Sequence, residues 1–151
     1  MKDPKLRLFT PADLDQILEI ERHSFGSEAF SKETFLTLYQ KFPNLFIIAE
    51  VDEKIVGYII TCGLGHKGHV ASIAVAPSFR HKGIGGALAD LTFEKLKACG
   101  AKYVELEVRI TNREALDFWK RLGFSPFGIS RRFYEDGEDA LRMKKMLERE
   151  D

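Results

Sequence analysis

One segment, residues 72–88, limits the possible folds of this chain more than any other. Its sequence, SIAVAPSFRHKGIGGAL, reads as a strand that ends at a proline, then a basic, glycine-rich turn, then a helix. Glycines let the backbone take positive φ and approach a ligand closely. The first amides of a helix lack an internal acceptor, and the helix dipole favours anions there. We therefore expect the N–H groups of residues 82–86 to bind a pyrophosphate, with Arg80 and Lys82 adding positive charge.

Two common phosphate motifs do not match this chain. Residues 83–88 read GIGGAL, so Leu88 replaces the last glycine of G-x-G-x-x-G, and the acidic residue of a dinucleotide fold does not follow at its usual spacing. Residues 63–69 nearly spell a P-loop, but His69 stands where the phosphate-binding lysine is required. A plainer interpretation stays open, in which Gly83, Gly85 and Gly86 only form a tight turn between a strand and a helix.

Hydrophobic patterns divide the rest of the chain into strands and helices. Thr10, Pro11 and Asp13 are suited to open a first helix, and a second helix is expected from Ser31 to about Phe42. A third helix should follow the glycine turn and end near Cys99. A fourth helix should follow Asn112 and end at Leu122. Strands are expected over residues 6–9, 44–51, 54–62, 68–75, 102–109, 124–130 and 140–147. This order predicts a mixed α/β domain with antiparallel and crossover connections.

Composition narrows the class of protein. The 151 residues fit a single domain, residues 1–151, and 44% hydrophobic with 30% charged residues is typical of a globular chain. The formal net charge is zero, which argues against a dedicated nucleic-acid binder. The sequence has no apolar run long enough to span a membrane and no signal peptide, so we expect a cytoplasmic location and no membrane partner. Two cysteines, Cys62 and Cys99, are too few for a disulfide framework, although one bridge stays possible.

Three segments carry a resemblance to a known family. Arg80-x-x-Gly83-x-Gly85 resembles the acetyl-CoA signature of the GNAT acetyltransferase superfamily, and the strand Ile73-Ala74-Val75 precedes it as in that family. The family's next motif resembles residues 106–109 (LEVR), Asn112 and residues 122–124 (LGF) of this chain. Residues 133–140, FYEDGEDA, resemble the loop YYxDGEDA of N-terminal acetyltransferases. Together they are similar to the archaeal members of that group, which are related to the catalytic subunit of eukaryotic N-terminal acetyltransferase A and to bacterial ribosomal-protein alanine acetyltransferase.

The resemblance implies a fold and a set of binding residues. The fold is α/β (α+β), the GNAT acyl-CoA N-acyltransferase fold, with a central mixed, mostly antiparallel seven-stranded sheet flanked by about four helices. The cosubstrate is acetyl-CoA, and no metal is expected. The residues expected to bind it are Ile73, Ala74, Val75, Arg80, His81, Lys82, Gly83, Ile84, Gly85, Gly86, Asn112 and Trp119. The partners implied are peptide or protein N-termini, with an auxiliary subunit or the ribosome as further partners.

Acetyl transfer from a thioester to an amine needs a neutral amine, donors for the developing oxyanion and, for the leaving thiolate, a proton. A model α-amine has a pKa near ~7.8, so on the order of one in ten is neutral at pH 7, whereas a lysine side chain, near ~10.4, is neutral only about once in 2,500. A base acting through water is therefore sufficient for an α-amine.

Four residues are candidates for the chemistry and for peptide binding. The resemblance implies a catalytic His69 on the strand before the turn, Glu28 as a second proton acceptor that also reads the peptide, and Glu107 as the base of the bacterial relatives. Tyr134 lies in the presumed peptide loop. Each has a plainer interpretation: a half-buried strand residue for His69, a solvated loop charge for Glu28, the polar face of a strand for Glu107 and a surface anchor for Tyr134.

Phe30 and Phe133 complete the expected peptide site. Phe30 ends the stretch Ser27-Glu28-Ala29-Phe30, which resembles P-E-N-Y of the archaeal relatives, and Phe133 begins the peptide loop. One position departs from the family. Bacterial relatives have a tyrosine that protonates the CoA thiolate where this chain has Trp119, and an indole N–H has no acidic proton to give. We therefore assign Trp119 no proton transfer, and packing against the pantetheine or in the core stays open.

Three alternatives stay open at this point. Cys62, His66 and His69 suggest a metal site only weakly, because a fourth ligand is missing and on one strand His66 and His69 would face opposite ways unless a bulge or turn intervenes. An acetyltransferase for lysine side chains or small amines is the first rival, and the peptide-like loop at residues 133–140 argues against a small amine. A non-catalytic acyl-CoA-binding module is the second rival, and it predicts binding without turnover.

Overall fold

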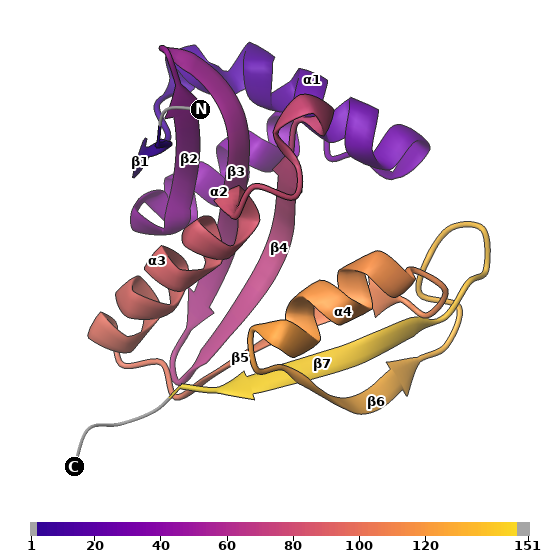
Figure 1. Ribbon diagram of the computed structural model, residues 1–151. Coiled ribbons are helices and arrows are strands. Elements are labelled where there is room, and N and C mark those ends of the chain that lie inside the picture. The colour runs from indigo at the N-terminus through magenta and orange to yellow at the C-terminus, as the bar shows by residue number, and fades with distance from the viewer. Residues whose placement is uncertain (1–2, 148–151) are drawn as a thin grey trace.

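The structure is a computed structural model that describes residues 3–147 of the chain. One seven-stranded sheet runs through it in the order β1-β2-β3-β4-β5-β7-β6, and Figure 1 shows its path. The strands are β1 (Lys5–Leu8), β2 (Phe46–Val51), β3 (Lys54–Leu64), β4 (Lys67–Val75), β5 (Tyr103–Arg109), β6 (Ser125–Ser130) and β7 (Ala140–Met146). The helices are α1 (Leu14–Phe25), α2 (Lys32–Lys41), α3 (Ile84–Ala98) and α4 (Arg113–Arg121). The expected mixed, mostly antiparallel sheet with four helices is confirmed.

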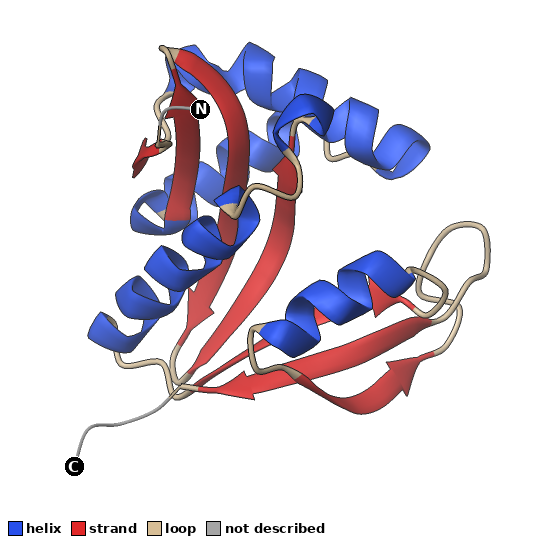
Figure 2. Ribbon diagram, in the orientation of Figure 1, coloured by secondary structure: helices blue, strands red, loops and turns tan. Residues whose placement is uncertain are grey.

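Helices cover both faces of the sheet, because successive strand residues point to opposite sides. Phe46, Ile48 and Ile60 pack with Ile17 of α1 and Phe35 of α2. The alternate residues of the same strands, among them Ile47, Ala49 and Ile59, pack with α3 and with Trp119 of α4. Figure 2 shows α3 and α4 on the near side of the sheet and α2 behind it. Each face therefore has its own hydrophobic core.

Among the strands of residues 3–147, only β4 and β5 are parallel neighbours, and the sheet splits between them. β4 pairs with β5 at three positions, Lys67 with Tyr103, Gly68 with Val104 and His69 with Glu105. Beyond His69 the two strands diverge, which is visible in Figure 1 as the widening angle between β4 and β5. The remainder of β4 keeps its ladder with β3 on one side but has no ladder with β5 on the other. The split exposes a strand edge in the middle of the domain.

Local sequence explains where the helices begin. The Ser31 hydroxyl accepts a hydrogen bond from the Thr34 amide, and the Asn112 side chain accepts one from the Ala115 amide, so both helices have side-chain caps, of which the one at Asn112 was expected. Asp13 accepts from the Thr10 amide at 2.8 Å, but Pro11–Asp13 forms a short 3₁₀ turn, and α1 begins only at Leu14. The expected helix start was therefore three residues too early.

Two further boundaries differ from expectation. The strand expected from Asn44 begins at Phe46, because Pro43–Leu45 forms a 3₁₀ turn, and proline has no N–H for a ladder. β3 and β4 are longer than expected and leave only Gly65 and His66 as their turn. His66 thus lies in the turn and not on the strand of His69, so the argument that two histidines on one strand face opposite ways does not apply to this pair.

Candidate active site

A histidine and a glutamate meet where the sheet splits. The Nε2 atom of His69 on β4 lies 2.7 Å from the Oε1 atom of Glu107 on β5. His69 is in the last pair before the strands diverge, and Glu107 lies two residues beyond its pairing partner Glu105. The side chains are 30% and 16% exposed, so both are reachable but partly desolvated. Two residues that the sequence proposed separately, 38 positions apart, are therefore one hydrogen-bonded pair.

A third group stands beside this pair. Cys62 on β3 is the direct cross-strand partner of His69, and partners in an antiparallel ladder point to the same face of the sheet. Its interaction with the Cys62 thiol, followed by the hydrogen bond to Glu107, raises the pKa of His69 to about 9, while burial acts in the opposite direction. The hydrogen bond from His69 lowers the pKa of Glu107. At neutral pH the pair is therefore an imidazolium and a carboxylate.

Arg109, at the end of β5, connects the two loops that flank this pair. Its guanidinium contacts Glu28 of the loop between α1 and α2, and it also donates to Asp136 at 2.9 Å and to Glu138 at 3.0 Å in the loop between β6 and β7. Hydrogen bonds to these carboxylates raise the pKa of Arg109 further above its ordinary value. Glu28 is thus an ion-paired residue that helps to join two loops, and the interpretation as a solvated charge is wrong.

The aromatic candidates lie around this ion-pair cluster. The Tyr134 ring faces the Arg109 guanidinium at 4.1 Å, and burial raises the pKa of Tyr134 to about 12. Phe133 packs edge-on against Tyr134, with centroids 5.0 Å apart, and is 51% exposed. Phe30 belongs instead to the base of the loop between α1 and α2, where its ring contacts Phe35. Tyr134 and Glu28 are therefore brought together through Arg109. Phe30 does not join them, because it packs at the base of the loop between α1 and α2.

A buried polar network anchors that loop from below. Glu21 of α1 is 1% exposed, and its carboxylate accepts hydrogen bonds from the Phe30 amide at 2.9 Å, from Ser72 at 2.8 Å and from the Tyr58 hydroxyl. Burial, and then the charge of Glu21, raise the pKa of Tyr58 above its ordinary value. The network ties the Glu28 loop to β3 and β4, and it gives Phe30 its position.

The glycine turn lies at the other side of the split, at the start of α3. Gly83 has φ +84° and caps the helix, and the first i→i−4 bond runs from the Ala87 amide to the Gly83 carbonyl at 3.0 Å. The amides of residues 84–86 come before that bond and have no carbonyl of the helix to reach. A Cβ atom at Gly83 or Gly86 would meet nothing within 4 Å. The turn is therefore an open cradle of amides, which fits an anionic group.

The side chains of this turn differ in their contacts and in their exposure to solvent. The Arg80 guanidinium donates to the Val75 carbonyl at 2.9 Å and to the Ser24 hydroxyl at 3.3 Å, so it holds the end of β4 and the end of α1. Lys82 and His81 are exposed, and His81 has φ +62°. Ile84 is 1% exposed and packs in the core, so only its amide faces the turn.

The remaining cosubstrate candidates occupy three environments. Ala74 is buried under α1, whereas Ile73 and Val75 are half-buried on the α3 side, all on the part of β4 that has no ladder with β5. Asn112 caps α4 with its side-chain oxygen. Trp119 is 5% exposed and packs edge-on against Phe118 and Phe124, so its ring lies in the core. The neighbouring Phe118 ring is the one that packs close to Gly85.

Sequence reasoning missed two of these residues as members of a site, Arg109 and Glu21, and it considered Cys62 only as a weak metal ligand. A signal existed for Arg109 and for the position of Cys62 opposite His69. Glu107 and Arg109 are two apart on one strand and must share a face. A two-residue turn at Gly65-His66 would have placed Cys62 opposite His69. Glu21 had no signal, because a glutamate on an amphipathic helix is ordinarily solvated.

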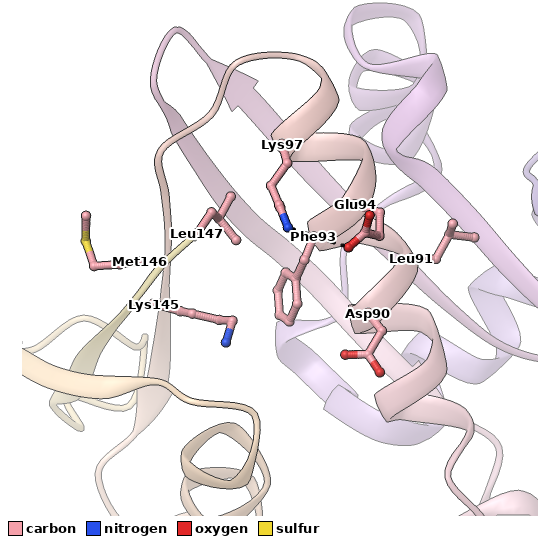
Figure 3. A pocket seen from close by; sticks show the side chains of 8 residues that line it. All are labelled: Asp90, Leu91, Phe93, Glu94, Lys97, Lys145, Met146 and Leu147. Carbon is pink, nitrogen blue, oxygen red and sulfur yellow. Dashed lines mark ion pairs between the residues drawn. The ribbon is translucent and has the colours of Figure 1, made fainter. Parts of the chain in front are cut away.

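A pocket of about 430 Å³ lies away from this site, between α3 and the end of β7. Figure 3 shows Asp90, Phe93, Glu94 and Lys97 of α3 facing Lys145 and Leu147. Lys145 donates to the Leu122 carbonyl at 2.8 Å, and Lys97 and Glu94 form an ion pair at 3.7 Å. Both lysines of the pocket are therefore engaged by neighbouring groups. Because the pocket also lies along the half of α3 that is far from the glycine turn, we assign it no chemistry.

Within residues 3–147, no group of three or more His, Cys, Asp or Glu side chains has the arrangement of a metal site. Cys62 and Cys99 are both free, so the disulfide that the sequence left possible is not formed. In the same described part of the chain, none of the helices is long and apolar enough to cross a membrane.

Comparison with known proteins agrees with this geometry. The profile of the acetyltransferase (GNAT) family matches residues 14–124. The N-alpha-acetyltransferase of Sulfurisphaera tokodaii is 36% identical to this chain over an alignment of 159 positions. The alignment covers 97% of this chain and 95% of that protein. The crystal structure of Ard1 from Thermoplasma volcanium has a TM-score of 0.92 at 27% identity, covering 97% of this chain and 99% of the other.

A bacterial enzyme also superposes on nearly the whole chain. The ribosomal-protein-S18-alanine N-acetyltransferase of Escherichia coli has a TM-score of 0.85 at 25% identity, covering 99% of this chain and 97% of the other. Both halves of the expected relationship, to archaeal N-alpha-acetyltransferases and to the bacterial alanine acetyltransferase, are therefore confirmed. From the family match and the full-length relatives we conclude that this chain is an N-acetyltransferase of the GNAT family, which uses acetyl-CoA.

Proposed function

We propose that this chain transfers the acetyl group of acetyl-CoA to the α-amine of protein N-termini. The observation that carries the proposal is the pairing of His69 with Glu107 beside two loops that Arg109 holds together. A peptide terminus can approach between those loops, with Glu28 and Tyr134 on either side of it. The relatives that are named N-alpha-acetyltransferases support the same substrate class.

In this proposal the two sides of the split bind different substrates. The amides of residues 84–86, with Lys82 and His81 beside them, hold the pyrophosphate of acetyl-CoA. Gly83, Gly85 and Gly86 keep side chains out of its path, and Arg80 secures the strand end that leads to the turn. The edge of β4 at Ile73, Ala74 and Val75, which has no ladder with β5, offers backbone groups to the pantetheine, apart from the Val75 carbonyl that Arg80 contacts. Acetyl-CoA supplies the activated acyl group, and the residues of this chain position it.

The other side of the split receives the amine. Three carboxylates surround the single guanidinium of Arg109, those of Glu28, Asp136 and Glu138. The region between the two loops therefore has an excess of negative charge, which favours binding of an α-ammonium. An α-ammonium close to His69 repels the positive charge of the imidazolium. Because like charges disfavour one another, His69 loses its proton more easily when the amine is bound. His69, oriented by Glu107, then accepts a proton from the amine through water, and Glu28 assists.

His69 also offers an answer to the missing tyrosine. Trp119 is buried and cannot give a proton. The protonated His69 has a pKa of about 9, which is close to the ~8.5 of an ordinary thiol. Transfer of its proton to the departing thiolate is therefore nearly balanced, and one residue can serve as base and then as acid. The amine attacks the thioester directly in this scheme, and neither cysteine takes part in the chemistry.

The test is CoA release with acetyl-CoA and peptides that differ only in their first two residues. Nα-blocked peptides, peptides with an internal lysine and a polyamine serve as controls. Turnover on free N-termini alone is expected, and the panel ranks the preferred first residue. Turnover on blocked, lysine-containing peptides would point to the rival substrate class, and acetyl-CoA binding without turnover on any amine would overturn the proposal. An auxiliary subunit or a ribosome contact stays a prediction from the resemblance.

A further inference from the structure

Glu21 is a buried acidic residue that the proposed reaction does not use. It lies on α1 and is 1% exposed. One carboxylate oxygen, Oε2, accepts a hydrogen bond from the Phe30 amide at 2.9 Å. The other oxygen, Oε1, accepts from the Ser72 hydroxyl at 2.8 Å and from the Tyr58 hydroxyl. All three donors are uncharged, and burying an acidic group among uncharged donors is costly. Packing alone therefore does not explain this residue.

The hydrogen bond to Phe30 fixes one end of the loop between α1 and α2. The loop begins at Gly26, which has φ +57° and ends α1, and Gly26–Glu28 forms a 3₁₀ turn. Glycine leaves that end of the loop conformationally free. At the other end, two residues after Glu28, the Phe30 amide is held by Glu21. The position of Glu28 therefore depends on a carboxylate that lies beneath the loop.

The other two hydrogen bonds tie Glu21 to the strands that carry the site. Ser72 lies on β4, three residues after His69 and directly before the stretch proposed to line the pantetheine. Tyr58 is fully buried on β3, the strand that keeps its ladder with β4. One carboxylate therefore bonds the loop through one oxygen and the strand of His69 through the other.

We propose that Glu21 is a positioning residue that sets the loop between α1 and α2 against β4, so that the bound amine meets His69 and the thioester. Because Glu21 is buried, it acts through the loop and contacts neither substrate. The inference rests on the proposed function, which assigns this loop to the peptide. A small misplacement of a reacting group lowers the rate strongly. Removal of the carboxylate should therefore impair use of the peptide, while acetyl-CoA still binds, since β4 keeps its ladder with β3.

Two substitutions of Glu21 test the role of its hydrogen bonds. Glu21→Leu removes every acceptor, and we expect kcat/KM for the peptide to fall about thirtyfold. Glu21→Gln keeps a carbonyl oxygen for the Phe30 amide, and its NH₂ group can donate to the two hydroxyl oxygens, so kcat/KM should stay within about threefold. Calorimetry should give a Kd for acetyl-CoA within about twofold of the unmodified chain for both variants.

The pH profile of kcat should keep its shape in both variants, since the pair of His69 and Glu107 is not changed. If Glu21→Leu is not folded, Glu21→Asp replaces it, because Asp is one methylene too short to bond both β4 and the Phe30 amide, and about a tenfold loss is expected. A loss of acetyl-CoA affinity as large as the loss in kcat/KM, a changed pH profile, or an equal loss for Gln and Leu would overturn the proposal.

Asp13 provides the matched control for stability. It is a second buried carboxylate, 6% exposed, directly before α1 and thus at the other end of that helix from the loop. It accepts from the Thr10 amide at 2.8 Å and pairs with Arg7 at 2.9 Å. Asp13→Ala should lower the thermal midpoint, as Glu21→Leu does, but leave kcat/KM for the peptide within about twofold. Equal kinetic losses in Asp13→Ala and Glu21→Leu would refute a positioning role.

Amide hydrogen exchange reads the loop anchor without turnover. Glu21→Leu should speed exchange of the Phe30 amide about tenfold, because its acceptor is gone. The Ala115 amide, which the Asn112 side chain caps on α4, is the reference and should not change. An unchanged rate at Phe30 would overturn the proposal. If the unmodified chain acetylates none of the amines, only the proposed function fails, because exchange at Phe30 still decides whether Glu21 holds the loop.

Discussion

The two sides of the split between β4 and β5 are built in different ways. The glycine turn on the α3 side is one continuous segment whose binding groups are backbone amides. The site on the other side consists of side-chain pairs: His69 of β4 with Glu107 of β5, and Arg109 of β5 with Glu28 of the loop after α1. A turn that binds through its backbone tolerates changes of side chain, whereas a pair of side chains loses its contact when either member is removed. Substitutions on the two sides should therefore have different consequences.

The largest effect is expected at the pair where the strands part. His69→Ala and Glu107→Gln should each lower kcat by about 10²- to 10³-fold, within the range for loss of a general base, with little change in the KM for acetyl-CoA. Steady-state kinetics with the best peptide measures both constants. Since the two residues act as one unit, the double variant should be little worse than either single one, and additive losses would show independent roles.

Removal of the link between the loops should come next. Arg109→Ala leaves Glu28 and Glu138 without their cation, so we expect the KM for peptide to rise about tenfold and the KM for acetyl-CoA to stay within about twofold. Arg121→Ala, on the exposed end of α4, is the matched loss of an arginine and should change neither constant. An equal rise in both KM values for Arg109→Ala would mean that the whole domain is disturbed.

For the glycine turn, the comparison is between two glycines with similar positive φ, one in the turn and one outside it. Gly83 has φ +84° and Gly100 has φ +92°, so alanine at either position should cost about 1 kcal/mol of folding free energy. Only Gly83→Ala should also raise the KM for acetyl-CoA, by roughly threefold to tenfold, because only this turn faces the proposed pyrophosphate. Denaturant unfolding and kinetics on the same two variants separate strain from binding.

The pH dependence sharpens the assignment of the catalytic side. The pKa of His69 is raised to about 9 in the folded chain, above its ordinary 6.5, so its interactions stabilise the fold fully below pH 6.5. That stabilisation is lost as the pH rises through about 9. NMR titration of His69 should show the high midpoint, and Glu107→Gln should move it down toward 6.5. A midpoint that Glu107→Gln leaves in place would contradict the paired geometry.

The smallest effect on catalysis is expected from Trp119. Trp119→Phe should leave kcat within about twofold, because the indole is buried and has no proton to transfer. Its thermal midpoint should fall, since the smaller ring leaves space beside Phe118 and Phe124. Trp119→Tyr is the informative companion: a clear gain in kcat would mean that the proton for the thiolate limits the rate.

Local patterns were sufficient for much of the fold. The strand, glycine turn and helix of residues 72–98 appeared as expected, as did the helix start near Ser31 and the cap at Asn112, because each depends on neighbouring residues and on backbone geometry. The errors fell at element ends. Pro11–Asp13 and Pro43–Leu45 formed 3₁₀ turns, and β3 and β4 extended beyond their expected ends to leave a turn of two residues.

The sequence by itself determined the family, the α/β class, the glycine cradle and the identities of His69, Glu28, Glu107 and Tyr134 as candidates, because these depend on contiguous motifs and on residue chemistry. Only the tertiary structure decided which of them meet. The register of β3 with β4 places Cys62 opposite His69, and the divergence of β4 from β5 leaves Glu107 within reach of His69. The fold also brings Arg109 between two loops that lie more than 100 residues apart, a contact that no local pattern encodes because it depends on how the whole sheet is assembled.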